Sequence, residues 1–201
     1  MTAQDWQLLI LAGGRGRRLG GIDKGLMEGN GQPVVRMLHQ RFQPPHCLVS
    51  ANRHAERYCA LGFTTVADRR PDFAGPLAGL EALMVAAPDL PAILVPCDMP
   101  NLPDDLPAQL LSRLQRRDAI VVAHDGERLQ PLCMALWPTY WRDNLAVYLD
   151  QGGRSVQGWL DSKQVEVCQF DDGRCFHNIN TPADLTNPAL WERQSGRSHN
   201  D

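Results

Sequence analysis

Short apolar runs alternate with amphipathic segments along most of the chain. Apolar runs of about five residues that end at polar residues or glycine are typical of buried strands and too short for ordinary helices. They predict strands over residues 8–12, 47–51, 63–67, 92–95 and 119–123. Residues 124–128 have the composition of a turn, and the apolar run 131–136 that follows can pair back on the last of these strands.

Helical spacing and helix-ending signals occupy the intervals between the strands. Pro76 stands where a helix would begin, and Gly62 stands where another would end. The pattern predicts helices over residues 34–42, 54–61, from 75 onward, around 106–114 and over 137–148. We expect the apolar positions of these helices, including the aromatic residues of the last, to lie in the core.

Strands that alternate with helices, with room for crossovers, form mostly parallel sheets covered on both faces. The sequence therefore predicts a three-layer, Rossmann-like α/β fold. No repeat, linker or low-complexity stretch interrupts the pattern, so residues 1–193 are expected to form a single domain. Residues 194–201 are polar and without periodicity, which is typical of a flexible tail.

Composition narrows the class of ligand. With 201 residues, 43% hydrophobic and 21% charged, the chain can bury one substantial core. Its net charge of −3 offers no overall attraction for nucleic acid, so any bound anion is expected to be small. The six cysteines form no C-x-x-C pair and no zinc-binding spacing. Without a secretion signal or a stretch of about 18 apolar residues, the sequence predicts a cytoplasmic protein with no membrane segment.

The first predicted strand runs into a loop at residues 13–21 that contains five glycines and three arginines. Glycines let backbone N–H groups converge on a ligand, and arginines add positive charge, so the loop is suited to a phosphate chain. The alternative is an ordinary solvent-exposed connection between a strand and a helix. The alternation of glycines with arginines, followed by Asp23 and Lys24, argues against it. The loop matches neither the dinucleotide motif G-x-G-x-x-G nor the P-loop.

Four predicted strands end at Gly13, Asn52, Asp68 and Asp98. The carboxyl ends of parallel strands meet at one edge of a sheet, where open α/β sheets bind their ligands. We therefore expect these four residues to line a common binding site.

Asp98 lies in a Pro-Cys-Asp-Met-Pro turn directly after a strand and is the strongest candidate for a Mg²⁺ ligand. Its alternative, a cap for the helix that starts near Asp104, is too distant in sequence. Lys24 can bring a point charge to phosphates, and Arg18 can hold two phosphate oxygens at once. Asp98, Lys24 and Arg18 are the predicted catalytic residues.

Two further positions carry open alternatives. Asp68 can bind metal or nucleotide, or can be a surface charge paired with Arg69 or Arg70. Asn52 can contact a sugar or base, or can cap the following helix.

The motifs Leu-Ala-Gly-Gly at residues 11–14, Arg-Leu-Gly-Gly at 18–21 and Asp-Lys at 23–24 resemble the signature of nucleotidyltransferases that attach a nucleoside monophosphate to a phosphorylated acceptor. The usual methionine is leucine here, and one residue is added before the aspartate. Within that superfamily the chain resembles the MobA-like molybdenum cofactor guanylyltransferases. The segments that share this resemblance are Ala-Asn-Arg-His at 51–54, Gly-Pro-Leu-Ala-Gly at 75–79, Pro-Cys-Asp at 96–98, His-Asp-Gly-Glu-Arg at 124–128 and Asn-Ile-Asn-Thr-Pro at 178–182.

The resemblance implies a nucleotide-diphospho-sugar transferase-like fold, GTP and molybdopterin as substrates, Mg²⁺ as cofactor, and molybdoenzyme-maturation proteins as partners. It implies that Asp98 binds Mg²⁺ and that GTP contacts Leu11, Ala12, Gly13, Lys24, Asn52, Asp68 and Asp98. It also makes Arg154, Asn178 and Asn180 candidates for the pterin site. Residues 181–184 additionally read as a helix start, with Thr181 as the cap and Asp184 in the first turn.

The sequence thus predicts transfer of GMP from GTP to the terminal phosphate of molybdopterin, without a covalent protein nucleophile. Base choice is not decided by the residues, so a CTP- or other NTP-dependent transferase acting on a pterin, isoprenoid or sugar phosphate stays open. A non-catalytic nucleotide- or cofactor-binding accessory protein is the alternative from another class.

Overall fold

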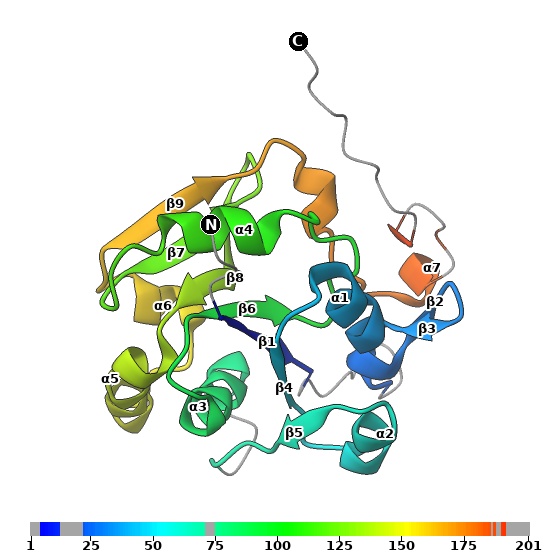
Figure 1. The fold of residues 1–201 in the computed structure, drawn as a ribbon, viewed down its shortest axis with the longest axis horizontal. Coiled ribbons are helices and arrows are strands. Elements are labelled where there is room, and N and C mark those ends of the chain that lie inside the picture. Colours follow the sequence, from blue (N-terminus) through cyan, green and yellow to red (C-terminus); the bar gives the residue numbers. More distant parts are fainter. Residues whose placement is uncertain (1–4, 13–21, 71–74, 186, 188–189, 192–201) are drawn as a thin grey trace.

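A seven-stranded sheet forms the centre of the molecule (Figure 1). The structure is a computed structural model that describes residues 5–12, 22–70, 75–185, 187 and 190–191. The strands, in the order β5-β4-β1-β6-β8-β7-β9, are β5 (Thr64–Val66), β4 (His46–Ser50), β1 (Gln7–Leu11), β6 (Ala92–Pro96), β8 (Leu129–Leu136), β7 (Ile120–His124) and β9 (Val165–Gln169). β8 is antiparallel to both of its neighbours, and the other pairings are parallel. The expected mostly parallel sheet is therefore confirmed.

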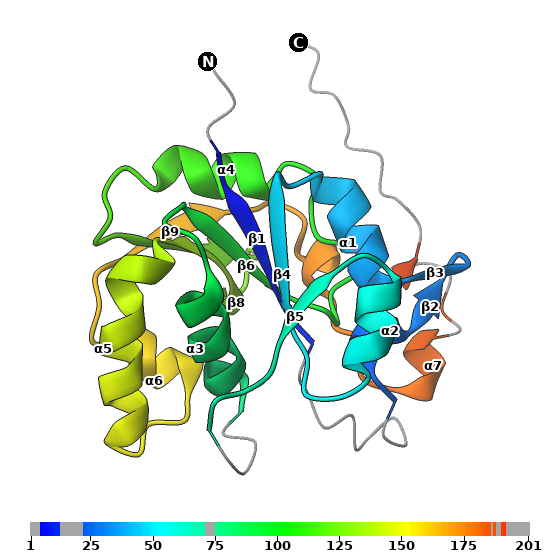
Figure 2. The same cartoon turned by 60° about the horizontal axis from the view of Figure 1, so that its bottom comes forward.

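Helices cover both faces of this sheet, which gives the expected three layers (Figure 2). One face carries α1 (Val34–Phe42), α2 (Ala55–Ala60) and α4 (Leu106–Arg113), and the other carries α3 (Pro76–Ala86), α5 (Pro138–Asp150) and α6 (Val156–Leu160). Successive side chains of a strand point to opposite faces, so Leu8 and Ile10 of β1 lie in one core while Leu9 and Leu11 lie in the other. β1 is thus buried on both sides, as its apolar run predicts.

The sequence analysis missed several short elements. They are the hairpin of β2 (Glu28–Gly29) and β3 (Gln32–Pro33), α6, the edge strand β9, and the 3₁₀ turns η2 (Lys24–Leu26) and η3 (Gly173–Phe176). This hairpin turns at Asn30 and Gly31, which both have positive φ (52° and 75°), as a type I′ turn requires. Tyr140 was expected in the core but is 51% exposed, since α5 packs through Trp141 and Leu145 instead.

The C-terminal part of the chain returns from β9 to the region of Lys24. The Ile179 amide donates to the Asp98 carbonyl oxygen at 2.8 Å, which ties this return to the end of β6. The short helix α7 (Pro182–Leu185) follows, and Asp184 Oδ2 accepts from the amides of Asn180 and Thr181, both at 2.8 Å. The Thr181 hydroxyl accepts from the Asp184 amide in turn, so the predicted helix start is confirmed.

Two expectations concern segments beyond the core. The tail predicted at residues 194–201 lies outside the described residues. In the described part of the chain, none of the helices has the length and apolarity that crossing a membrane requires.

Candidate active site

The carboxyl edge of the sheet gathers the residues predicted to meet there. Asn52, Asp68 and Asp98 follow the ends of β4, β5 and β6, and these strands are parallel to β1 or to one another. The chain moves from β1 outward through β4 to β5 and then returns to β6 on the other side of β1. Such a reversal opens a crevice at the carboxyl ends of the two central strands. Gly13 and Arg18, with the whole glycine-rich loop, lie outside the described residues.

Lys24 joins two of the predicted residues at this crevice. Its ammonium donates to Asp98 Oδ2 at 2.9 Å and to Asn180 Oδ1 at 3.1 Å. The Lys24 and Asp98 side chains are each 20% exposed, so the pair is accessible to a ligand from one side. An ammonium has three donors, and within the described residues these two contacts leave one of them for an incoming anion. The structure therefore presents a positive charge and a carboxylate side by side.

A buried polar cluster fixes the position of Lys24. Asp23 caps the turn η2 and accepts from the Gly25 amide at 3.2 Å. Its Oδ1 accepts from the Tyr58 hydroxyl at 2.5 Å, and its Oδ2 lies 3.2 Å from His54 Nδ1. Burial, and then the bond to Asp23, raise the pKa of Tyr58 well above its ordinary value, so the phenol remains a donor. The sequence analysis missed Asp23, Tyr58 and His54 as a group, and only the adjacency of Asp23 to Lys24 could have indicated it.

Asn52 and Asp68 form a second pair on the β4–β5 side. Asn52 Nδ2 donates to Asp68 Oδ2 at 2.8 Å, and Asn52 Oδ1 accepts from the Asp68 amide at 2.8 Å. The suggested pairing of Asp68 with Arg70 is wrong, because Arg70 binds Glu81 instead, and no ion pair joins Asp68 to Arg69 within the described residues. The suggested helix cap at Asn52 is also wrong, because His54 is the N-cap of α2. Asp68 Oδ1 is buried and has no hydrogen-bond partner among the described residues. Burial raises the pKa of Asp68, the bond from Asn52 opposes this, and the nearby charge of Glu81 adds to the rise.

The end of β1 is held between its neighbours. The Ala12 amide donates to the Ser50 carbonyl at 2.9 Å, and the Leu11 carbonyl accepts from the Cys97 amide at 3.0 Å. Helix α3 comes unusually close here, because a Cβ placed on Gly79 would stand 2.6 Å from Ser50 Oγ. Leu11 and Ala12 themselves are buried, so a ligand would meet their main chain rather than their side chains.

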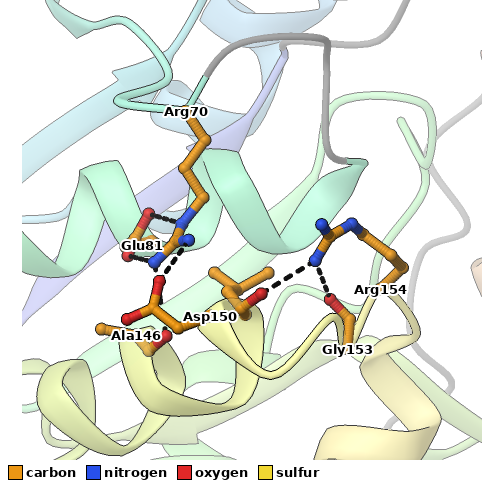
Figure 3. A network of polar contacts seen from close by, with 7 residues as sticks. Arg70, Glu81, Ala146, Asp150, Gly153 and Arg154 are labelled. Carbon is orange, nitrogen blue, oxygen red and sulfur yellow. Dashed lines mark hydrogen bonds and ion pairs between the residues drawn. The ribbon is translucent and has the colours of Figure 1, made fainter.

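The three candidates for the pterin site divide between two places. Asn180 contacts Lys24, as described above. Asn178 lies two positions earlier in the same return segment, and its Oδ1 is buried without a partner in the described part of the chain. Arg154 instead donates to the carbonyls of Leu149 (3.0 Å) and Gly153 (2.6 Å) at the end of α5 (Figure 3). The described contacts of Arg154 thus do not bring it to Lys24.

The residues at the crevice fit a magnesium ion bound mainly through substrate. Asp98 Oδ2 accepts from Lys24, whereas Oδ1 accepts no hydrogen bond within the described residues. One available carboxylate oxygen is suited to Mg²⁺, which is commonly held by one or two carboxylates, phosphates and water. Burial raises the pKa of the adjacent Cys97 thiol, so that side chain stays protonated and does not compete as a ligand. In the described parts of the chain, no group of three or more His, Cys, Asp or Glu side chains gathers as a separate metal site.

Comparison with known proteins connects this geometry with a family. The model of the MobA-like NTP transferase domain matches residues 8–165. A molybdenum cofactor guanylyltransferase of Shewanella sp. (strain MR-4) is 41% identical over 178 residues, which span 87% of this chain and 90% of the relative. The protein of the same name from Shewanella halifaxensis is 40% identical over 186 residues, covering 90% of this chain and 92% of the relative.

Solved structures share the fold. The crystal structure of molybdopterin-guanine dinucleotide biosynthesis protein A from Archaeoglobus fulgidus superposes with a TM-score of 0.72 at 20% identity, covering 90% of this chain and 95% of that one. The 2-C-methyl-D-erythritol 4-phosphate cytidylyltransferase from Thermus thermophilus superposes with a TM-score of 0.66 at 17% identity, covering 89% and 94%. At these identities the superpositions establish the architecture and leave the substrates to other evidence.

Proposed function

The chain belongs to the MobA-like NTP transferase family, and we propose that it acts as a molybdenum cofactor guanylyltransferase, in agreement with relatives that bear this name at about 40% identity. The reaction transfers GMP from GTP to the terminal phosphate of molybdopterin and releases pyrophosphate. The observation that carries this proposal is the Lys24–Asp98 pair, held at the crevice between β1 and β6.

Lys24 and Asp98 have complementary tasks in this reaction. An oxygen of the molybdopterin phosphate attacks the α-phosphorus of GTP, a new P–O bond forms, and the bond to the bridging oxygen breaks with its electron pair leaving on pyrophosphate. Negative charge builds up on the phosphate oxygens in the transition state. The third donor of Lys24, which no described residue accepts from, is proposed to stabilise it. Arg18 and the backbone at Gly13 are proposed to hold the phosphate chain, as the composition of their loop suggests.

Asp98 is the proposed ligand of a Mg²⁺ ion, through the carboxylate oxygen that Lys24 does not use. The bound ion would neutralise phosphate charge and orient the α-phosphate for in-line attack. Lys24 then keeps the Asp98 carboxylate fixed through Oδ2, so that both groups meet the substrate in a constant geometry.

The two remaining groups are assigned to the two substrates. The nucleoside part of GTP is proposed to bind at the ends of β1, β4 and β5. The residues there are Leu11, Ala12, Asn52 and Asp68. The return segment with Asn178 and Asn180 lies on the β6 side of Lys24 and is proposed to bind the pterin, with Arg154 as a more distant candidate. On this arrangement Asn180 meets both substrates, because it contacts the lysine that acts on the phosphates.

Three wider assignments accompany the reaction. We place the enzyme in the cytoplasm, where its six free thiols would stay reduced. Residues 1–193 are proposed to act as one nucleotidyltransferase domain. Proteins that mature molybdoenzymes are proposed to receive the product.

Release of pyrophosphate from each of the four NTPs, with Mg²⁺ and with or without molybdopterin, tests the proposal. Release that requires both GTP and molybdopterin is expected. Release with CTP would favour transfer of CMP, the type of reaction in the name of the Thermus thermophilus cytidylyltransferase that shares the fold. Binding of GTP without release under any of these conditions would favour an accessory nucleotide-binding role.

A further inference from the structure

Arg70 links the end of β5 to two helices on one face of the sheet (Figure 3). Its Nε and Nη2 donate to the two carboxylate oxygens of Glu81 in α3, both at 2.7 Å. Nη1 donates to Asp150 Oδ1 in α5 at 2.7 Å, and Nη2 reaches the Ala146 carbonyl at 3.3 Å. We call these contacts of Arg70 the Arg70 clamp.

The buried carboxylate of Glu81 is unusual for its position. Its side chain is 7% exposed and lies in a helix whose neighbouring residues, including Leu80 and Ala82, are buried and apolar. A buried ion pair is weak evidence for stability, since well-packed apolar residues of similar volume often replace it without loss. Stability alone therefore does not explain why an arginine and a glutamate stand here. Holding this part of the chain in one geometry does explain the pair.

The clamp holds the chain next to a proposed nucleotide-binding pair. Arg70 follows Asp68 by two positions, and Asp68 is bonded on both its carboxylate and its amide to Asn52. Two residues span roughly 7 Å at most, so a shift of Arg70 is transmitted to Asp68 with little slack. The segment at the end of β5 is thus held by Asn52 on one side and by Glu81 on the other.

The charge of Glu81 also acts on Asp68. Glu81 is one of the groups that raise the pKa of Asp68, after burial. Arg70 neutralises Glu81 through a bidentate contact, and without it the field of Glu81 would act on Asp68 in full. The Arg70 clamp therefore affects both where Asp68 stands and how readily it carries its charge.

We propose that Arg70 is a positioning residue for nucleotide binding, which acts through Glu81 to hold Asn52 and Asp68 in the geometry that GTP requires. Arg70 itself touches no substrate. The inference rests on the proposed binding of GTP at this edge of the sheet. Because the pair would bind the nucleoside equally in the ground state and the transition state, losing its geometry raises KM for GTP and leaves kcat nearly unchanged.

The test compares Arg70→Met with the double variant Arg70→Met/Glu81→Met, which replaces the buried ion pair by apolar side chains. Arg116→Met is the matched control, because Arg116 makes the same bidentate type of contact with Asp118 and precedes β7, which lies near the opposite edge of the sheet, next to β9. KM for GTP, KM for molybdopterin, kcat, Kd for GTP by calorimetry and the melting temperature are measured for each.

We expect KM and Kd for GTP to rise roughly tenfold or more in both Arg70 variants, with kcat within about twofold and KM for molybdopterin unchanged. The double variant should regain the melting temperature of the wild type and keep the raised KM, which a purely stabilising pair would not do. Should Arg70→Met fail to fold, the double variant alone decides between these outcomes.

A double variant with wild-type KM and Kd for GTP would overturn the positioning role while leaving the proposed function intact. Absence of GTP binding by the wild type would instead overturn the proposed function, and this inference with it. The Arg116→Met control should match the wild type in every constant.

Discussion

Replacing Lys24 by alanine separates its chemical role from its structural one. The substitution removes the ammonium that contacts Asp98 Oδ2 and Asn180 Oδ1 and leaves the buried Asp23 cluster in place. The chain also supplies a matched control, because its only other lysine is Lys163. Lys163 Nζ lies 5.9 Å from the ring centroid of Trp141 in α5 and 5.8 Å from that of Trp159 in α6. These contacts involve none of the residues assigned to the active site.

The structure predicts a moderate effect of Lys24→Ala on stability and a large one on turnover. Both members of the Lys24–Asp98 pair are 20% exposed, so water can solvate Asp98 when the ammonium is gone. An exposed ion pair contributes about 0–1 kcal/mol, whereas removing one partner of a buried pair costs about 3–5 kcal/mol. For this partly buried pair we therefore expect a loss of about 1–3 kcal/mol, which in a domain of this size lowers the melting temperature by about 2–12 °C. Loss of a donor aimed at transition-state charge costs about 3 kcal/mol, roughly a hundredfold in kcat.

The assay is pyrophosphate release under saturating GTP and molybdopterin, together with thermal unfolding of the same preparations. Lys24→Ala should lower the melting temperature within the stated range and lose about two orders of magnitude in kcat. Lys163→Ala should keep the turnover of the wild type. Normal turnover of a folded Lys24→Ala enzyme would refute the role given to Lys24.

The remaining predictions concern neighbouring groups. Asp68→Asn should raise the free energy of unfolding at pH 7, because burial raises the pKa of Asp68 and its charged form therefore costs stability above that pKa. In urea unfolding, this gain in stability should shrink as the pH falls toward about 4. A gain that does not depend on pH would contradict the assignment. Tyr58→Phe removes a hydrogen bond to the buried carboxylate of Asp23 and should cost about 1.5–3 kcal/mol, seen as a melting temperature lower by about 3–12 °C; an unchanged value would mean that Asp23 is satisfied without Tyr58. Gly79→Ala should cost about 1–3 kcal/mol in urea unfolding, because the new methyl group would stand 2.6 Å from Ser50 Oγ, and a neutral result would show that Ser50 can move aside. Chelation of divalent metal should abolish pyrophosphate release and added Mg²⁺ should restore it, whereas release that persists in chelator would exclude the metal role.

Local patterns were sufficient to predict the layered fold and the edge that carries the site. Apolar runs located β1, β4, β5 and β6, and because these strands are parallel, their polar ends at Asn52, Asp68 and Asp98 meet at one edge. The edge strand β9 escaped prediction because only one of its five residues is buried, which leaves little apolar signal.

The pairings within the site could not be predicted, because they join residues far apart in the sequence. Tyr58 reaches Asp23 across 35 positions and Asn180 reaches Lys24 across 156. Which polar side chains meet depends on how α2 and the C-terminal return pack against the sheet, and periodicity carries no information on that. Asp68 illustrates the limit, since adjacency in sequence offered Arg69 or Arg70 as an alternative partner, whereas the folded chain pairs it with Asn52.

The fate of the α-phosphate of GTP tests the central claim most directly. Enzyme, Mg²⁺ and molybdopterin are incubated with GTP labelled at the α-phosphorus, and the label is followed into pterin, protein and free nucleotide. The account predicts label in a pterin dinucleotide, in amounts equal to the pyrophosphate released, and none attached to protein. Label bound covalently to the protein, or recovered only as free nucleotide, would contradict direct transfer of GMP between the two substrates at this site.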